Sequence, residues 1–204
     1  MTVQGSPPKV ELSSARIVDI SGANYQDIPT DYFAHESCRS CLYWEAETAT
    51  TGSAREREVL KRTWFNRAGS IFGPCGKLVY LNGKVVAWAQ YAPANCFPRA
   101  GTYHTCPSED AYLISCLAVS PRCRRRGYGE LLLRAIVDDL AGRGVRAVET
   151  FAKKNDSNNP SGPAEFYLER GFRILKDDEQ FPLLRFDLGQ IPLRDTSVVR
   201  LSRL

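Results

Sequence analysis

The spacing of apolar residues changes along the chain, and each change marks an expected element. Apolar and polar residues alternate over 16–20, which predicts a first strand. Residues 112–119 form a nearly continuous apolar run, typical of a strand buried on both faces. From 127 to 140, apolar residues recur every three or four positions, as on one face of a helix. Residues 145–152 then predict another strand, so this region should run strand, helix, strand with parallel pairing.

Two short-range signals are equally clear. Asn82-Gly83 separates two strand-like runs, 76–81 and 84–91, and supplies the two positive φ angles that a type I′ hairpin turn requires. Ser53 and Glu56 have the spacing of a capping box, in which a hydroxyl and a carboxylate bond the free amides at a helix start. We therefore expect a hairpin over 76–91 and a helix from 53 to about 68.

The remaining segments are less regular. Residues 26–47 predict one or two short helices, 92–110 a loop, 163–170 a short helix and 183–188 a last strand. Residues 1–14 and 189–204 should form a loose start and a tail on a single domain, 1–204. The fold class is therefore α+β, with a mixed sheet built around a parallel strand-helix-strand core.

Composition excludes several classes of protein. With 43% hydrophobic and 10% aromatic residues the chain can fill a core, and its 15 Gly and 12 Pro follow no repeat. We find neither an apolar stretch of roughly 18 residues for a membrane span nor the apolar segment of a secretory signal. The expected protein is soluble and cytoplasmic, and its seven cysteines are expected to be reduced.

The basic residues are unevenly distributed. The net charge of +4 gives only a weak electrostatic footprint for nucleic acid. However, the chain has 20 Arg and 7 Lys, and four of these arginines lie within 122–126. A guanidinium fork suits phosphate better than an ammonium group does. This cluster is therefore the first place to expect a phosphate group.

The same cluster joins the buried strand to the long helix. Gly127 and Gly129 at this junction would let a ligand approach the backbone closely, and the free amides at the helix start attract an anion. This pattern describes a pyrophosphate cradle. On these residues alone, an ordinary strand-to-helix turn with solvated arginines explains the pattern equally well.

Two motifs carry a family resemblance. Arg124-x-x-Gly127-x-Gly129 resembles the acyl-CoA-binding signature Gln/Arg-x-x-Gly-x-Gly/Ala of the GNAT N-acetyltransferases. Residues 164–172 resemble that family's A-x-x-Y-x-x-x-G-F segment, and the order of elements over 78–186 is similar to the family's. A looser resemblance, over 38–45, is to actinobacterial-type members of unassigned substrate. A classical nucleotide fold is disfavoured because neither Gly-x-Gly-x-x-Gly nor a Walker lysine is present.

The resemblance implies a sheet splayed between the strand ending at Val119 and the strand at 145–152, with acetyl-CoA bound in the gap. The backbone of Leu117, Ala118 and Val119 would pair with pantetheine, and the Leu117 amide would polarise the thioester carbonyl. The Arg side chains could reach the adenosine 3′-phosphate. The residues implied at the phosphates are Arg124, Arg125, Arg126, Gly127, Tyr128, Gly129 and Glu130.

The implied reaction is direct transfer of an acetyl group to a primary amine of a small molecule or protein. Tyr167 occupies the family's tyrosine position and is the candidate acid for the thiolate, although it could equally be a core aromatic. Histone-acetylating members carry a glutamate where Leu113 stands here. Glu149, Glu109 and Asp110 remain as candidate bases, with a water chain as the alternative. Ser161 also replaces a common asparagine, which leaves one coenzyme A contact open.

The cysteines suggest further possibilities. His35, Cys38 and Cys41 have ligand-like spacing, and His104 with Cys106 could complete a zinc site. Buried thiols on a short aromatic helix are the preferred interpretation, so no metal is expected. Cys116 could in principle carry an acyl group, but no histidine partner is evident from the sequence.

Other functions and partners stay open. An aminoacyl-tRNA-dependent transferase would use the Arg-rich surface, including Arg194, Arg200 and Arg203, and a non-catalytic acyl-CoA sensor would use the same cleft. The intact signature favours acetyl-CoA over tRNA, and a homodimer is possible. Glu36, Glu45 and Glu47 could line a groove for a cationic amine, although a solvated acidic face is the simpler interpretation.

Overall fold

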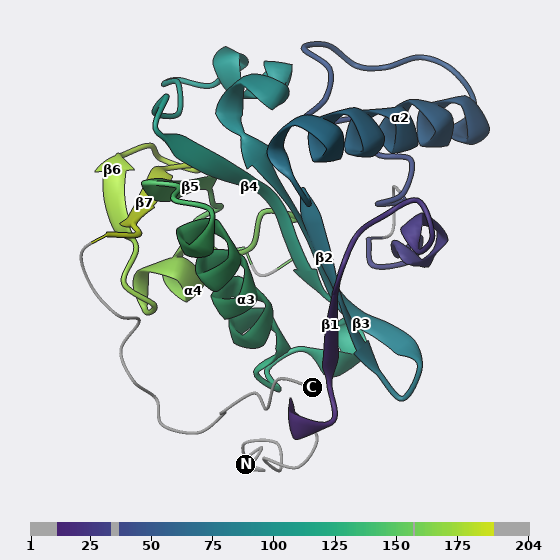
Figure 1. Ribbon diagram of the computed structural model, residues 1–204. Coiled ribbons are helices and arrows are strands. Elements are labelled where there is room, and N and C mark those ends of the chain that lie inside the picture. The colour runs from purple at the N-terminus through teal and green to yellow at the C-terminus, as the bar shows by residue number, and fades with distance from the viewer. Residues whose placement is uncertain (1–11, 34–36, 157, 190–204) are drawn as a thin grey trace.

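The computed structural model describes residues 12–33, 37–156 and 158–189. These residues form a seven-stranded sheet of order β1-β2-β3-β4-β5-β7-β6 (Figure 1). No helix within these ranges is long and apolar enough to cross a membrane. The strands are β1 Arg16–Asp19, β2 Gly76–Leu81, β3 Lys84–Pro93, β4 Ala111–Val119, β5 Ala147–Phe151, β6 Arg173–Lys176 and β7 Leu183–Asp187. The α-helices are α2 Ala54–Phe72, α3 Tyr128–Gly142 and α4 Ala164–Leu168, and the 3₁₀ turns are η1 Tyr25–Asp27, η2 Ala94–Cys96, η3 Pro98–Thr102 and η4 Pro121–Cys123.

The two faces of the sheet bury different helices. On one face, Phe65 of α2 packs in a core with Trp88 of β3 and the aromatic residues of the segment before α2. On the other, Leu132 and Ile136 of α3 pack in a core with alternate residues of the central strands and with α4. Because side chains alternate along a strand, the central strands are apolar on both faces, as the continuous run over 112–119 predicted.

The predicted mixed sheet is confirmed. Parallel pairing joins β4 to β5 through α3, with Leu113 opposite Glu149, and the other neighbouring strands pair antiparallel. Asn82 and Gly83 have φ angles of 50° and 75°, as a type I′ turn requires. The capping box also forms, with the Glu56 amide donating to Ser53 Oγ and the Ser53 amide donating to Glu56 Oε2.

Several boundaries and elements differ from the predictions. In the described part of 26–47 there is no α-helix: after η1 the chain makes turns, because Ile28, Leu42 and Trp44 are anchored at irregular intervals in the core. Helix α2 continues to Phe72, and β6 is an additional strand. The sequence did not indicate β6 because all its residues are exposed at the sheet edge, so it shows no apolar alternation. Residues 12–14, expected to be loose, lie in a helical turn.

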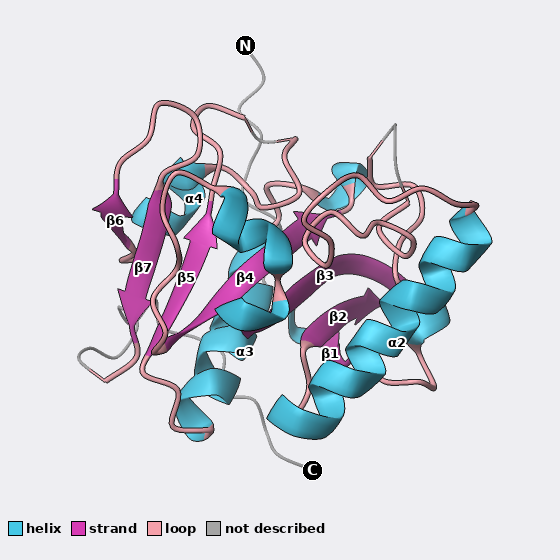
Figure 2. Cartoon of the chain, turned by 90° about the horizontal axis from the view of Figure 1, so that it is seen from above, coloured by secondary structure: helices cyan, strands magenta, loops and turns pink. Residues whose placement is uncertain are grey.

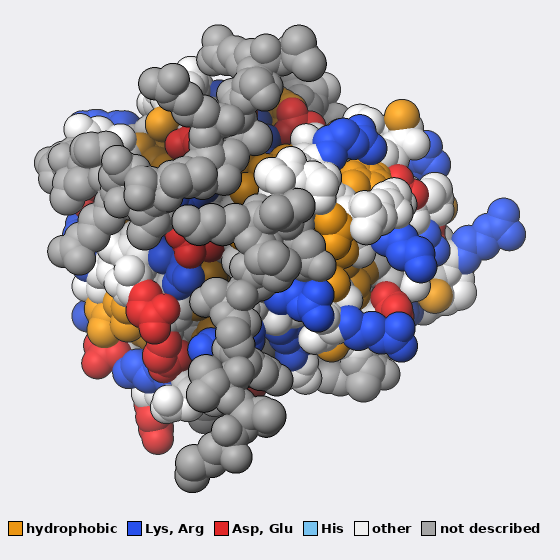
Figure 3. All heavy atoms as spheres, turned by 90° about the horizontal axis from the view of Figure 1, so that it is seen from below, with side chains coloured by type: hydrophobic (Ala, Val, Ile, Leu, Met, Phe, Trp, Pro, Cys, Tyr) orange, Lys and Arg blue, Asp and Glu red, His pale blue; other side chains and the backbone are white. Residues whose placement is uncertain are grey.

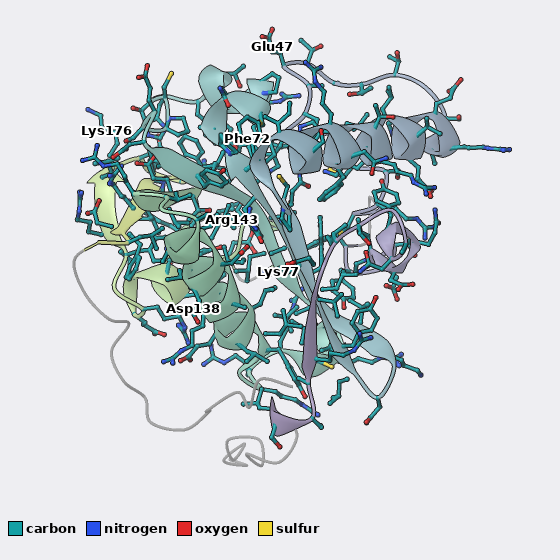
Figure 4. All side chains as sticks on the ribbon, in the orientation of Figure 1. Glu47, Phe72, Lys77, Asp138, Arg143 and Lys176 are labelled. Atoms are coloured by element: carbon teal, nitrogen blue, oxygen red, sulfur yellow. The ribbon has the colours of Figure 1, made fainter. Side chains whose placement is uncertain are left out.

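Arg143 connects the C-terminal ends of the two long helices, α2 and α3, through hydrogen bonds. Arg143 follows α3, and its Nη1 atom donates to the carbonyl oxygens of Phe72 and Pro74 at the end of α2, at 3.1 and 2.9 Å. It also pairs with Asp139, which lies 3.3 Å from Lys77 of β2. Figure 4 shows Phe72, Lys77 and Arg143 on these elements. This contact fixes α3 against the sheet, and with it the orientation of the opposite, N-terminal end of α3.

Candidate active site

A bulge in β4 begins the separation of the central strands. Gln90 of β3 lies opposite Cys116 and Tyr91 lies opposite Ile114, so Ser115 is an extra residue in β4. Backbone pairing between β4 and β5 ends at Leu113 and Glu149. Beyond it, Thr150 Oγ1 donates to the Ile114 carbonyl at 2.9 Å, and the two strands then diverge (Figure 2). The predicted splay between β4 and β5 is therefore present.

A loop from the end of β5 reaches into this splay. The Leu117 amide donates to the Pro160 carbonyl at 2.9 Å, so the amide expected at a thioester carbonyl faces the splay but is bonded to the loop. Successive amides of a strand alternate in direction, so the Val119 amide points to the same side. Gly162, with φ of 80°, lies close to both strand and helix: an added Cβ would come 3.6 Å from Tyr167 Oη and 3.8 Å from the Leu117 carbonyl.

The turn after β4 presents an uncapped helix start. The Ser120 amide donates to Val86, and η4 then leads through Arg125, φ 62°, to Gly127, φ 84°, which is the N-cap of α3. Within the part of the chain that the structure describes, no side chain caps this helix end. Its first-turn amides and the positive end of its dipole therefore face outward, which is the arrangement that binds phosphate at helix N-termini.

A cleft of about 720 Å³ connects the splay to this helix start. It is large enough for a small-molecule cofactor. Figure 3 shows the face that carries this end of α3, with Lys and Arg side chains spread over it among acidic and apolar ones. Of the predicted cofactor-binding residues, those that line the cleft are Leu117, Ala118, Val119, Arg124, Arg125, Arg126, Gly127, Gly129 and Glu130. Tyr128 does not line it and is buried beneath the turn.

The cleft is also lined by residues that were not predicted from the sequence. Phe166 and Arg170 of the α4 region line it, and the Arg170 guanidinium stacks 4.1 Å from the Phe166 ring centre while pairing with Glu130 at 3.2 Å. Arg124 crosses the cleft and donates to Asn158 Oδ1 at 2.9 Å. The four-residue spacing of Phe166 and Arg170 was the available signal, since it places both on one side of a helical turn.

Tyr167 lies beside the splay rather than on the wall of the cleft. It is fully buried, and its hydroxyl donates to the Ser161 carbonyl at 2.8 Å. Burial raises the pKa of Tyr167 well above its usual value, so the phenol keeps its proton across the physiological range. It packs edge-on against Phe166 and Phe172, so the tyrosine is a core aromatic whose hydroxyl donates a hydrogen bond to the loop.

Glu149 is fully occupied by other groups. It is completely buried, its Oε1 atom accepts from Arg185 Nη1 at 2.9 Å, and its Oε2 atom accepts from the Ser108 amide at 2.8 Å. Asp110 pairs with the same arginine at 2.9 Å. Glu109 is exposed and does not line the cleft. A carboxylate held in this way cannot take a proton from an amine without breaking its ion pair.

The cysteines do not gather into a metal site in the described part of the chain. Across residues 12–33, 37–156 and 158–189, no three His, Cys, Asp or Glu side chains are placed to hold an ion, and His35 lies outside these ranges. All seven cysteines are free thiols. Burial raises the pKa of Cys116 well above its usual value, which disfavours the thiolate that an acyl-enzyme would need.

Comparison with known proteins identifies the family. The chain is 12% identical to the PaiA N-acetyltransferase of Thermoplasma acidophilum, solved in complex with coenzyme A, with a TM-score of 0.57 over 85% of this chain and 99% of that one. An N-acetyltransferase of Staphylococcus aureus Mu50 is 16% identical, with a TM-score of 0.56 over 85% of this chain and 98% of that one. These similarities show the fold.

A curated relative matches over a shorter stretch. An amino-acid acetyltransferase of Neisseria meningitidis serogroup A is 39% identical over 66 residues, which are 32% of this chain and only 13% of that protein. The family model described as "Acetyltransferase (GNAT) family" matches residues 32–172, well over half of the 204 residues. With the splayed sheet and the glycine-containing turn at the start of α3 both present, the chain belongs to the Acetyltransferase (GNAT) family.

Proposed function

We propose that this protein transfers an acetyl group from acetyl-CoA to an amino group. One observation carries the proposal: a single cleft is lined both by the start of α3, at Gly127 and Gly129, and by the end of β4 in the splay, at Leu117 and Val119. A cofactor with a polyphosphate at one end and an amide-bearing arm at the other matches this order of groups. Two solved relatives of the same fold are described as complexes with coenzyme A and with acetyl-CoA.

Different residues of the cleft would bind different parts of the cofactor. The first amides of α3 and the side chains of Arg125 and Arg126 would hold the phosphates, because charge-assisted bonds to phosphate are strong. The edge of β4 at Leu117 and Val119 would pair with the pantetheine arm. The Pro160 carbonyl now bonded to the Leu117 amide would then be exchanged for the cofactor's own acceptor.

The chemical step is a direct acyl transfer. The nitrogen lone pair of the acceptor forms a bond to the thioester carbon, the carbon–sulfur bond breaks, and its electron pair leaves on sulfur. The nitrogen loses a proton to water, and the sulfur gains one to leave as the thiol. The Leu117 amide would stabilise the oxyanion, and Tyr167, which keeps its proton at neutral pH, would supply the proton to sulfur. The name of the Neisseria relative, an amino-acid acetyltransferase, supports an amino group as the acceptor.

Calorimetric titration of the purified chain with acetyl-CoA tests the proposal. Gly127→Ala should weaken binding about tenfold, because φ of 84° is strained for alanine and the added Cβ would lie 3.0 Å from Leu12 Cδ1. Gly142→Ala at the other end of α3 is the matched control, since its Cβ would meet no atom within 4 Å and Gly142 does not line the cleft. A wild-type chain that does not bind acetyl-CoA would exclude the proposed function.

A further inference from the structure

A buried ionic cluster lies on the α2 side of the sheet, outside the cofactor cleft. Lys61 of α2 and Glu45 of the preceding segment form an ion pair of 2.5 Å, with side chains only 2% and 4% exposed. Gln90 of β3, fully buried, donates through Nε2 to the same Glu45 Oε1 atom. The expectation that Glu45 belongs to a solvated acidic face is therefore wrong.

Two acceptor atoms of this cluster have no partner. Glu45 Oε2 and Gln90 Oε1 are buried and accept no hydrogen bond from any residue of 12–33, 37–156 or 158–189. Burial alone would lower the pKa of Lys61, but the Glu45 carboxylate offsets this effect and the net pKa is raised, so Lys61 stays protonated. Unsatisfied buried acceptors are rare in folded proteins because each loses its hydration without replacement.

The cluster adjoins the point where the acyl group is expected. Gln90 lies opposite Cys116, the residue before Leu117. Cys116 and Ala118 belong to the core on the α2 side, and Ala118 also lines the cleft together with Phe33. Residues two apart along a strand are separated by about 7 Å. Ala118, on the wall of the cleft, is therefore about 7 Å along β4 from Cys116, the residue opposite Gln90.

We propose that Glu45 and Gln90 bind the amino group of the acceptor and select a primary amine. This inference rests on the proposed acetyl transfer. Glu45 Oε2 and Gln90 Oε1 each take one N–H of the acceptor nitrogen, while Lys61 and Gln90 Nε2 hold the carboxylate through its other oxygen. A neutral primary amine supplies the two donors that the two acceptors need. An N-methylated amine or an alcohol supplies one and leaves a buried acceptor unpaired, which a polar site discriminates against strongly.

A thiol-release assay with acetyl-CoA and paired amines tests this assignment. The probes are 2-phenylethylamine and an N-terminally acetylated lysine peptide, each compared with its mono-N-methylated form. Gln90→Met keeps the Lys61–Glu45 pair and the side-chain volume but removes the amide. We expect kcat/KM for the primary amines to fall about tenfold, mainly through KM, and the preference over the N-methylated forms to shrink by a similar factor.

A second variant removes the charge of Glu45 without leaving a lone buried ion. Glu45→Gln combined with Lys61→Met should also raise KM for the amines, with acetyl-CoA affinity within about twofold of wild type. Glu47→Gln is the matched control, because Glu47 is an exposed carboxylate of the same segment (Figure 4) and should change nothing.

The outcomes separate this inference from the proposed function. Unchanged amine kinetics in both variants would assign the cluster to structure alone and overturn the inference, while acetyl transfer would stand. The inference is also excluded if the wild-type chain binds acetyl-CoA but acetylates none of the primary amines. Absence of acetyl-CoA binding would overturn both.

Discussion

Tyr167 lies where the loop after β5 meets β4, and it connects the two. Its hydroxyl bonds to Ser161, the neighbouring Pro160 carbonyl bonds to the Leu117 amide, and Gly162 packs against the tyrosine ring. A single short loop therefore accepts hydrogen bonds from both the candidate acid, Tyr167, and the candidate oxyanion donor, the Leu117 amide. If cofactor and substrate replaced these loop carbonyls as hydrogen-bond partners, the Tyr167 hydroxyl and the Leu117 amide would become available together. Neither β4 nor β5 would have to move.

Replacement of Tyr167 by phenylalanine separates its chemical role from its packing role. We expect kcat to fall about a hundredfold, as for loss of a general acid, with acetyl-CoA affinity within twofold of wild type. The free energy of unfolding should fall by only about 1 kcal/mol, the usual contribution of one hydrogen bond. Because burial raises the pKa of Tyr167, wild-type kcat should show no loss from its ionisation up to about pH 9.

Tyr112→Phe on the same β4 strand is the matched control for this variant. Tyr112 is half-buried and does not line the cleft, so its hydroxyl should not affect the rate. Steady-state kinetics with saturating acetyl-CoA and chemical denaturation measure the two effects separately. If kcat is unchanged in Tyr167→Phe, the tyrosine is a core aromatic only.

At the scale of elements, the sequence predicted those helix starts and turns that depend on interactions between neighbouring residues. Ser53, Asn82 and Gly127 each act on backbone groups within a few residues, and helix α2, the β2–β3 hairpin and the start of α3 form as expected. The segment before α2 has no such local determinant. Its aromatic anchors find partners far along the chain, as Trp44 does by stacking on Tyr103 and Phe151, and no periodic pattern indicates those contacts.

The capping box of α2 gives a direct test at this scale. Ser53→Ala removes the acceptor for the Glu56 amide, which lies 3.3 Å from Ser53 Oγ, so the free energy of unfolding should fall by about 1 kcal/mol. Ser70→Ala in the same helix serves as the control, because an exposed interior serine gains helix propensity when it becomes alanine. Urea denaturation should show the first change and little or none for the second. Equal midpoints for both variants would mean that tertiary packing alone fixes the start of α2.

At the scale of the whole molecule, the cofactor cleft and the ionic cluster occupy different parts of the sheet. The splay opens the sheet between β4 and β5, and the cofactor cleft runs from it to the start of α3, whereas the Glu45–Lys61–Gln90 cluster packs on the α2 face. The sequence predicted the first because the signature residues are consecutive. It did not predict the second because residues 45, 61 and 90 come from three separate elements, and only the fold brings them together.

Arg185 joins the far half of the sheet through three carboxylates. It bonds to the buried Glu149 and to Asp110 and Asp187. Hydrogen bonding to Arg185 lowers the pKa of both aspartates. Their contribution to stability is complete above the unfolded-state pKa of about 3.9 and is lost as the pH falls through the lower, folded-state values. The wild-type free energy of unfolding should therefore decrease progressively below about pH 4.

Arg185→Met should remove this pH dependence of the unfolding free energy. It should also show how much stability is lost when the buried Glu149 carboxylate has no cation. At pH 7 the variant should lose about 3–5 kcal/mol of unfolding free energy, because it leaves a fully buried carboxylate without its cation. Adding Glu149→Gln should recover much of the loss, since the neutral amide can still accept from the Ser108 amide.

Arg173→Met, which removes a half-exposed partner of Asp187, is the control and should cost under about 1 kcal/mol. Urea denaturation at pH 3, 5 and 7 measures all three. If the double variant is no more stable than Arg185→Met alone, Glu149 is not the group that requires the arginine, and the loss comes from the packing of the Arg185 side chain between β5 and β6.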